Sequence, residues 1–73
     1  MNPIKKHRKE KKMSLRALAD KAGVVPESVR QWENDGFMPT LQSLIEVSEA
    51  LGVDKHTMLD ELYDWRVSQY GRF

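Results

Sequence analysis

The polar side chains of residues 26–34 have the types and spacing that could carry out chemistry. Glu27 and Gln31 are four residues apart, so a helix places them on one face. Ser28 and Arg30 lie beside them. The chemistry would be recognition of a polar ligand by hydrogen bonds, because amide, carboxylate, hydroxyl and guanidinium groups donate or accept them. The same residues are typical of a helix surface that simply faces water, so the pattern alone leaves both interpretations open.

The sequence offers little for catalysis. It contains no cysteine, no pairing of a nucleophile with a base and no glycine-rich phosphate loop. The two histidines, His7 and His56, lie far apart in the sequence without evident partner ligands. We therefore expect no enzymatic activity, no catalytic residue, no metal site and no cofactor.

Two short helices joined by a tight turn are predicted to position the polar face. Ser14 is the expected N-cap of the first helix, because its side-chain oxygen can accept a hydrogen bond from an early backbone N–H. Gly23 suits the end of this helix, where the chain turns through a left-handed conformation, and Pro26 suits the first residue of the second helix. The inward stripes of the two helices are formed by Leu18, Ala19, Ala22, Val29 and Trp32.

This pattern resembles the helix-turn-helix of the Cro/cI-type (XRE) family of phage and bacterial DNA-binding domains. The resemblance is carried by the spacing of a small residue, a turn glycine and a β-branched residue, here Ala19, Gly23 and Val29. Residues 33–39 are similar to the family sequence that follows the motif, although their glycine comes one position later than usual. The resemblance covers residues 4–59 and implies an all-α fold, a five-helix lambda-repressor-like DNA-binding domain with a helix-turn-helix.

The resemblance implies that residues 26–34 form a recognition helix in the major groove of duplex DNA. The expected base contacts are Glu27, Ser28, Arg30 and Gln31. In the family the preceding helix points its N-terminus at a phosphate, which its free N–H groups and its dipole favour. The expected phosphate contacts are Lys12, Ser14, Leu15, Arg16 and Asn34. Leu15 and Pro26 depart from the family, because each stands where a polar side chain is common.

The resemblance also implies an ion pair between Arg8 on the first helix and Glu33 at the end of the recognition helix. A guanidinium can hold a carboxylate with two parallel hydrogen bonds, which fixes geometry as well as charge. The alternative is that Arg8 is one more exposed cation in the basic run of residues 4–12.

Length and charge are compatible with a small DNA-binding domain. Seventy-three residues allow one domain with a small core. Residues 1–36 hold nine Lys/Arg against five Asp/Glu, a net charge of +4, whereas residues 37–73 hold three against six, a net charge of −3. The basic half carries the helix-turn-helix, as phosphate binding requires, although basic runs are also common on solvated helices. No apolar run approaches the roughly 18 residues of a membrane span, and we expect a cytoplasmic protein.

Residues 40–62 are predicted to complete the DNA-binding domain, residues 1–62, with two further helices capped by Thr40 and Asp54. The expected core residues of these helices are Leu41, Leu44, Ile45, Val47, Ser48 and Leu51 in the fourth and Met58, Leu59 and Leu62 in a short fifth. Residues 63–73 are an aromatic-rich extension that packs on the domain, forms a dimer seam or frays. Its aromatic residues are Tyr63, Trp65, Tyr70 and Phe73.

Two functions from different classes fit these features. The first is sequence-specific binding of double-stranded DNA by a small repressor-like transcriptional regulator, acting as a homodimer because one such domain is too small for tight selective binding. The second is a protein-interaction module, such as an antirepressor, a repressor modulator or an antitoxin. Its partner would contact Phe37, Met38 or the extension of residues 63–73. Phe37 and Met38 also have a structural interpretation, which we favour, in which at least one of them closes the core.

Overall fold

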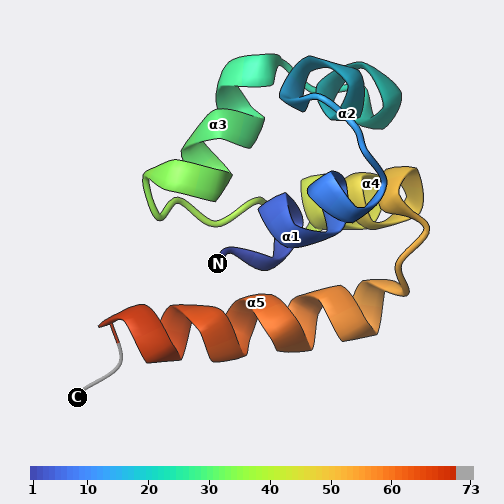
Figure 1. The fold of residues 1–73 in the computed structure, drawn as a ribbon. Helices are drawn as coiled ribbons and strands as arrows, with labels where there is room; N and C mark the ends of the chain where they lie inside the picture. The colour runs from blue at the N-terminus through green and yellow to red at the C-terminus, as the bar shows by residue number, and fades with distance from the viewer. Residues whose placement is uncertain (71–73) are drawn as a thin grey trace.

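Five helices make up the part of the chain that the computed structural model describes, residues 1–70. They are α1 (Pro3–Glu10), α2 (Leu15–Ala22), α3 (Pro26–Asn34), α4 (Leu41–Leu51) and α5 (Lys55–Tyr70). Figure 1 shows α2 and α3 at the top, α1 and α4 in the middle and α5 at the bottom. Residues 1–70 contain no β-strand, so the all-α, five-helix prediction is confirmed. Phe73 lies outside the described residues.

Side-chain caps begin three of the helices as predicted. Ser14 Oγ accepts a hydrogen bond from the backbone N–H of Ala17 at 3.0 Å. Thr40 Oγ1 accepts one from the N–H of Ser43 at 3.2 Å, and Asp54 caps α5 in the same way. Each cap satisfies a donor that its helix cannot pair internally, which explains why these helices begin where the sequence indicates.

A fourth cap, at Asn2, was not anticipated from the sequence. Its side-chain oxygen accepts hydrogen bonds from the backbone N–H groups of Ile4 at 2.9 Å and Lys5 at 3.2 Å. Its amide nitrogen donates to the carbonyl oxygen of Trp32 at 3.1 Å. Asn2 therefore starts α1 and also ties it to α3, and its side chain is buried.

The turn between α2 and α3 follows from three consecutive local signals. Gly23 has a φ of +74°, a left-handed conformation that glycine adopts without steric cost. The N–H of Val24 then closes the end of α2 by donating to the carbonyl of Ala19 at 3.0 Å. Pro26 begins α3, whereas Val25 at its N-cap provides no side-chain hydrogen bond.

One hydrophobic core joins all five helices. Helix α2 packs against α3 and α4, and α5 packs against α1 and α4. The buried apolar residues are Ile4, Leu18, Ala19, Ala22, Val29, Trp32, Leu44, Val47, Ala50, Leu51, Met58 and Leu62. Because α3 is held through its buried face, its opposite face is positioned rigidly at the surface.

Three predictions about α4 and α5 are wrong. Leu41 is 69% exposed and Leu59 is 44% exposed, so neither belongs to the core. They line an open apolar groove between α4 and α5 that no other element covers in residues 1–70. Leu59 also follows Met58 by one position, which turns it about 100° away from the buried face of α5. Helix α5 is not short, because neither glycine nor proline interrupts residues 55–70.

The interpretation that Phe37 or Met38 closes the core is also wrong. Phe37 is 58% exposed and Met38 is 37% exposed. The loop after α3 is held through its backbone instead. The N–H of Phe37 donates to the carbonyl of Gln31 at 3.4 Å, and Arg66 Nη1 donates to the carbonyl of Gly36 at 2.6 Å. Helix α5 thus supports the loop that follows α3.

Candidate nucleic-acid interface

Three of the four predicted base-contact residues, Glu27, Arg30 and Gln31, lie away from the buried Trp32 on α3, whereas Ser28 lies one turn before Trp32 at the edge of the buried face. Glu27 and Arg30 are exposed, and Ser28 and Gln31 are half-buried. They lie within two turns of one helix, so they form a continuous polar surface about the length of a few base pairs. A protruding helix with hydrogen-bonding side chains is the shape that the major groove admits.

A buried ion pair fixes α3 against α1. Arg8 Nε and Nη2 donate to the two carboxylate oxygens of Glu33 at 2.8 and 3.0 Å. Arg8 Nη1 donates to the carbonyl of Met13 at 2.9 Å, so the guanidinium also holds the turn between α1 and α2. The side chain of Glu33 is only 1% exposed and that of Arg8 only 11%. Hydrogen bonding to Glu33 raises the pKa of Arg8, which keeps its guanidinium charged.

A second cluster of charges lies on the exposed face of α3. Arg30 Nε and Nη2 donate to the carboxylate of Glu27 at 3.0 and 2.5 Å. Asp35 Oδ2 lies 3.1 Å from the same Nη2 atom. Sequence reasoning treated Glu27 and Arg30 as separate readers of bases and assigned no role to Asp35. The signal that was available is their spacing, since residues three apart on a helix are neighbours.

These contacts favour the charged forms of Arg30 and Glu27. The hydrogen bond to Glu27, together with the charge of Asp35, raises the pKa of Arg30 further above its ordinary value. The hydrogen bond from Arg30 lowers the pKa of Glu27. The cluster of Glu27, Arg30 and Asp35 therefore has a net charge of −1, although it lies on the surface expected to meet DNA.

Gln31 differs from Glu27 and Arg30 because its side chain makes no hydrogen bond to residues 1–70; the Ser28 hydroxyl makes none either. Its backbone carbonyl, in contrast, accepts from the N–H of Asp35 at 3.0 Å, which fixes the end of the helix beneath it. Asn34, a predicted phosphate contact, is exposed, and its side-chain nitrogen donates to the carbonyl of Arg30 at 3.2 Å. The amide of Gln31 and the hydroxyl of Ser28 can therefore meet a ligand without breaking a contact within residues 1–70.

The start of α2 carries the other predicted phosphate contacts. Lys12, Ser14 and Arg16 are exposed there. Ser14 Oγ already caps the helix, so its bond to Ala17 competes with a bond to a phosphate. Leu15 is half-buried against the core, and only its backbone N–H, in the first turn of α2, suits a phosphate.

His7 has a structural partner rather than a ligand. Its Nε2 lies 2.7 Å from Glu61 Oε1, and its Nδ1 lies 3.5 Å from Glu10 Oε1. The contact with Glu61 joins α1 to α5 across 54 positions of sequence, which is why the sequence did not reveal it. Within residues 1–70, no three His, Cys, Asp or Glu side chains are grouped so that they could hold a metal ion.

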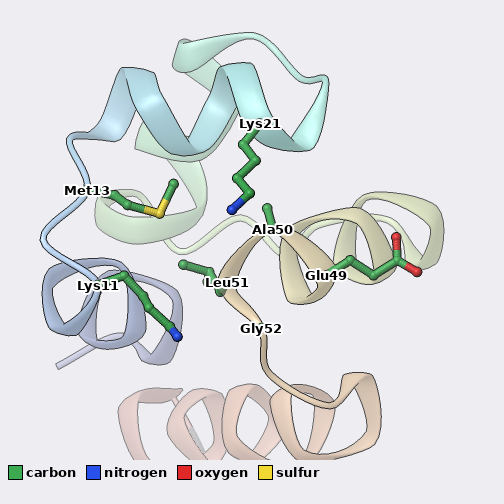
Figure 2. A pocket seen from close by; sticks show the side chains of 7 residues that line it. All are labelled: Lys11, Met13, Lys21, Glu49, Ala50, Leu51 and Gly52. Carbon is green, nitrogen blue, oxygen red and sulfur yellow. The ribbon is translucent and has the colours of Figure 1, made fainter.

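A shallow pocket of about 310 Å³ lies away from these residues, between α2 and the end of α4. Its lining residues are Lys11, Met13, Lys21, Glu49, Ala50, Leu51 and Gly52. Figure 2 shows Lys21 from α2 and Lys11 from the turn after α1 extending toward the end of α4. Cations are favoured beside the C-terminal end of a helix, and none of the lining residues is a predicted DNA contact, so we regard the pocket as structural.

Comparison with known proteins agrees with this geometry. A family model described as "Helix-turn-helix" matches residues 4–56. The chain belongs to this helix-turn-helix family. The resemblance to Cro/cI-type (XRE) domains is thereby confirmed.

Two relatives carry the name "HTH-type transcriptional regulator SinR". The protein from Bacillus subtilis (strain 168) is 45% identical over 62 residues, covering 84% of this chain and 56% of the relative. The protein from Bacillus licheniformis is 46% identical over 59 residues, covering 80% of this chain and 53% of the relative. The chain thus spans about half the length of these relatives. No solved structure matches the chain significantly.

Proposed function

We propose that this chain binds double-stranded DNA in a sequence-selective manner, as the DNA-binding part of a transcriptional regulator of repressor type. The observation that carries the proposal is the polar face of α3, which is exposed while its other face is locked into the core and to Arg8 through the buried Glu33. The family match and the names of the two relatives support the same function. Such a regulator acts in the cytoplasm and has no catalytic step.

In the proposed complex, α3 lies in the major groove and its side chains contact base edges. The free amide of Gln31 would pair with adenine, and Glu27 and Ser28 would contact neighbouring base pairs. The N-terminus of α2, with Lys12 and Arg16, would bind phosphates and set the position of α3 along the duplex. In this arrangement the phosphate contacts supply affinity, and the base contacts of α3 supply selectivity.

The proposed regulator acts as a homodimer. A single domain with one short recognition helix reads only a few base pairs, which is too little for selective binding. A two-fold symmetric dimer would read a pseudo-palindrome whose half-sites lie about 34 Å apart, one turn of the duplex.

Selection of bound sites from a random duplex library tests the proposal. We expect a symmetric motif, and we expect binding to random duplex to weaken steeply with salt. In the matched comparison, Gln31→Ala should cost about 1–3 kcal/mol on the selected site and relax the preference at one base pair per half-site. Gln42→Ala, at an exposed position of α4 outside the predicted contacts, should change neither. If no sequence is enriched and binding does not respond to salt, the proposal is wrong.

The exposed Phe37 and Met38 support a second candidate function, that of a protein-interaction module. Both side chains lie in the loop directly after α3, where neither has a role in the core. If this second function is correct, Phe37→Ala abolishes binding of a protein partner. Gln31→Ala then changes neither the binding of that partner nor any binding of DNA. If the chain binds DNA selectively instead, Gln31→Ala weakens binding to the selected site and Phe37→Ala leaves that binding unchanged.

A further inference from the structure

We propose that Asp35, which lies just beyond α3, restrains Arg30 and thereby lowers binding to non-specific DNA, so that it sharpens the selectivity of α3. This inference rests on the proposed function and assigns a positioning role to a residue outside the predicted set of DNA contacts. It also revises the role of Arg30, which was expected to read a base directly.

The first step is the hydrogen-bonding capacity of Arg30. A guanidinium has five N–H groups, and bidentate recognition of guanine uses two of them on one edge. The edge formed by Nε and Nη2 is occupied by the carboxylate of Glu27. Asp35 Oδ2 lies 3.1 Å from Nη2. Asp35 therefore also occupies part of the second edge, which Nη1 and Nη2 form. In this arrangement Arg30 presents only Nη1 unhindered, which is insufficient for a bidentate contact with guanine.

The second step is that the position of Asp35 is set by the backbone. Asp35 is the C-cap residue of α3, and its N–H donates to the carbonyl of Gln31 at 3.0 Å. The next turn is fixed by the bond from Arg66 to the carbonyl of Gly36. The backbone of Asp35 is therefore held beside Arg30 by contacts that do not depend on Arg30, and from this position its short side chain reaches the Arg30 guanidinium.

The third step is the effect of the cluster on a phosphate backbone. Non-specific binding depends on phosphate contacts by Lys and Arg, whereas selectivity depends on base edges. With Arg30 neutralised by Glu27, the charge of Asp35 gives the exposed face of α3 a net repulsion toward phosphates. This repulsion acts on every sequence, but a correct site offsets it through the contacts of Gln31. The ratio of specific to non-specific affinity therefore rises.

The test is a double-mutant cycle between Asp35→Asn and Arg30→Gln, read as affinity for random duplex and for the selected site at several salt concentrations. We expect Asp35→Asn to strengthen binding to random duplex about tenfold and to steepen the salt slope by about one unit, because the edge of Arg30 formed by Nη1 and Nη2 becomes available for a phosphate contact while Glu27 keeps the other edge. The affinity for the selected site should rise less, so the specificity ratio falls. In the Arg30→Gln background, Asp35→Asn should strengthen binding only about twofold, as the loss of one charge predicts.

Asp20→Asn is the matched control, because Asp20 is an exposed carboxylate on α2 that forms no ion pair within residues 1–70. Equal effects of Asp35→Asn in the two Arg30 backgrounds, or an effect no larger than that of Asp20→Asn, would overturn the inference and leave the proposed function intact. If the unmodified chain binds no duplex at low salt, the proposed function itself is wrong. Circular dichroism of Asp35→Asn checks that the helices are retained.

Discussion

Two arginines contact carboxylates of α3, and their surroundings give them opposite roles. Arg8 and Glu33 are almost fully buried, with side chains 11% and 1% exposed. Arg30 and Glu27 are 44% and 59% exposed. Breaking a buried pair leaves an unpaired charge away from water and is strongly destabilising, whereas an exposed pair contributes little to folding. The first pair therefore supports the fold, and the second is available to influence binding.

The buried pair leads to a prediction about stability. Glu33→Ala should lower the free energy of unfolding by about 3 kcal/mol, because it leaves the guanidinium of Arg8 buried without its partner. Denaturant melts of Glu33→Ala, Arg8→Ala and the double mutant measure the coupling between them. Glu27→Ala serves as the control and should scarcely change the melt. A coupling energy near zero would contradict the structural role of the pair.

The exposed pair leads to a prediction about pH. Because Arg30 lowers the pKa of Glu27, the pair is fully formed above the ordinary glutamate pKa of about 4.3 and is lost only as the pH falls through the lowered value. The carboxyl carbon signal of Glu27, followed by NMR, should titrate below that ordinary value. In Arg30→Gln the midpoint should rise toward it. An identical midpoint in both proteins would show that the pair does not persist in solution.

Among the elements, α3 has the least satisfied beginning. Helices α1, α2 and α4 each start with a side chain that accepts a backbone hydrogen bond, but Val25 at the N-cap of α3 cannot do so. Val25 is 62% exposed and its backbone has φ −79° and ψ 145°, which is the extended conformation of an N-cap. The recognition helix consequently depends on its packing and on Glu33, rather than on its own first turn.

A prediction at this scale follows from the missing cap. Val25→Ser should raise the free energy of unfolding by about 1 kcal/mol, because the serine oxygen can accept from a free N–H at the start of α3. Thermal melts provide the measurement. The reverse change at the capped helix, Ser14→Val, should lower stability by a similar amount. If Val25→Ser has no effect, tertiary packing alone determines where α3 begins.

In the whole molecule, α5 contacts both α1 and the loop after α3. Its buried residues Met58 and Leu62 complete the core, Glu61 contacts His7 of α1, and Arg66 supports the loop after α3. Past residue 62 the helix continues, with Tyr63 exposed by 65%. The second half of α5 is therefore a helical surface that extends from the domain (Figure 1).

Deletion of residues 63–73 tests what this surface does. The monomer should stay folded, because Met58 and Leu62 remain in the core. The dimer population should fall, because exposed apolar side chains such as Tyr63 and Val67 are removed. Sedimentation measures the dimer, and circular dichroism measures the fold. An unchanged dimer would place the seam elsewhere, and loss of the helical signal would show that the second half of α5 is needed by the core.

By itself the sequence determined the local structure of this protein. Local features depend only on neighbouring residues, so they can be predicted from the sequence without knowing the fold. Examples are the caps at Ser14 and Thr40, the left-handed Gly23 and Pro26 at the start of α3. The apolar spacing of α2 and α3 showed which face of each helix is buried for the same reason. A polar face for α3 followed as the complement of its buried face.

Only the tertiary structure decided which distant groups meet and which apolar residues stay exposed. Asn2 reaches Trp32, His7 reaches Glu61 and Phe37 remains in solvent, because these outcomes depend on how helices pack rather than on local spacing. Local hydrogen bonds depend on adjacent atoms, whereas packing places atoms from remote positions side by side, and no pattern within one segment encodes that placement.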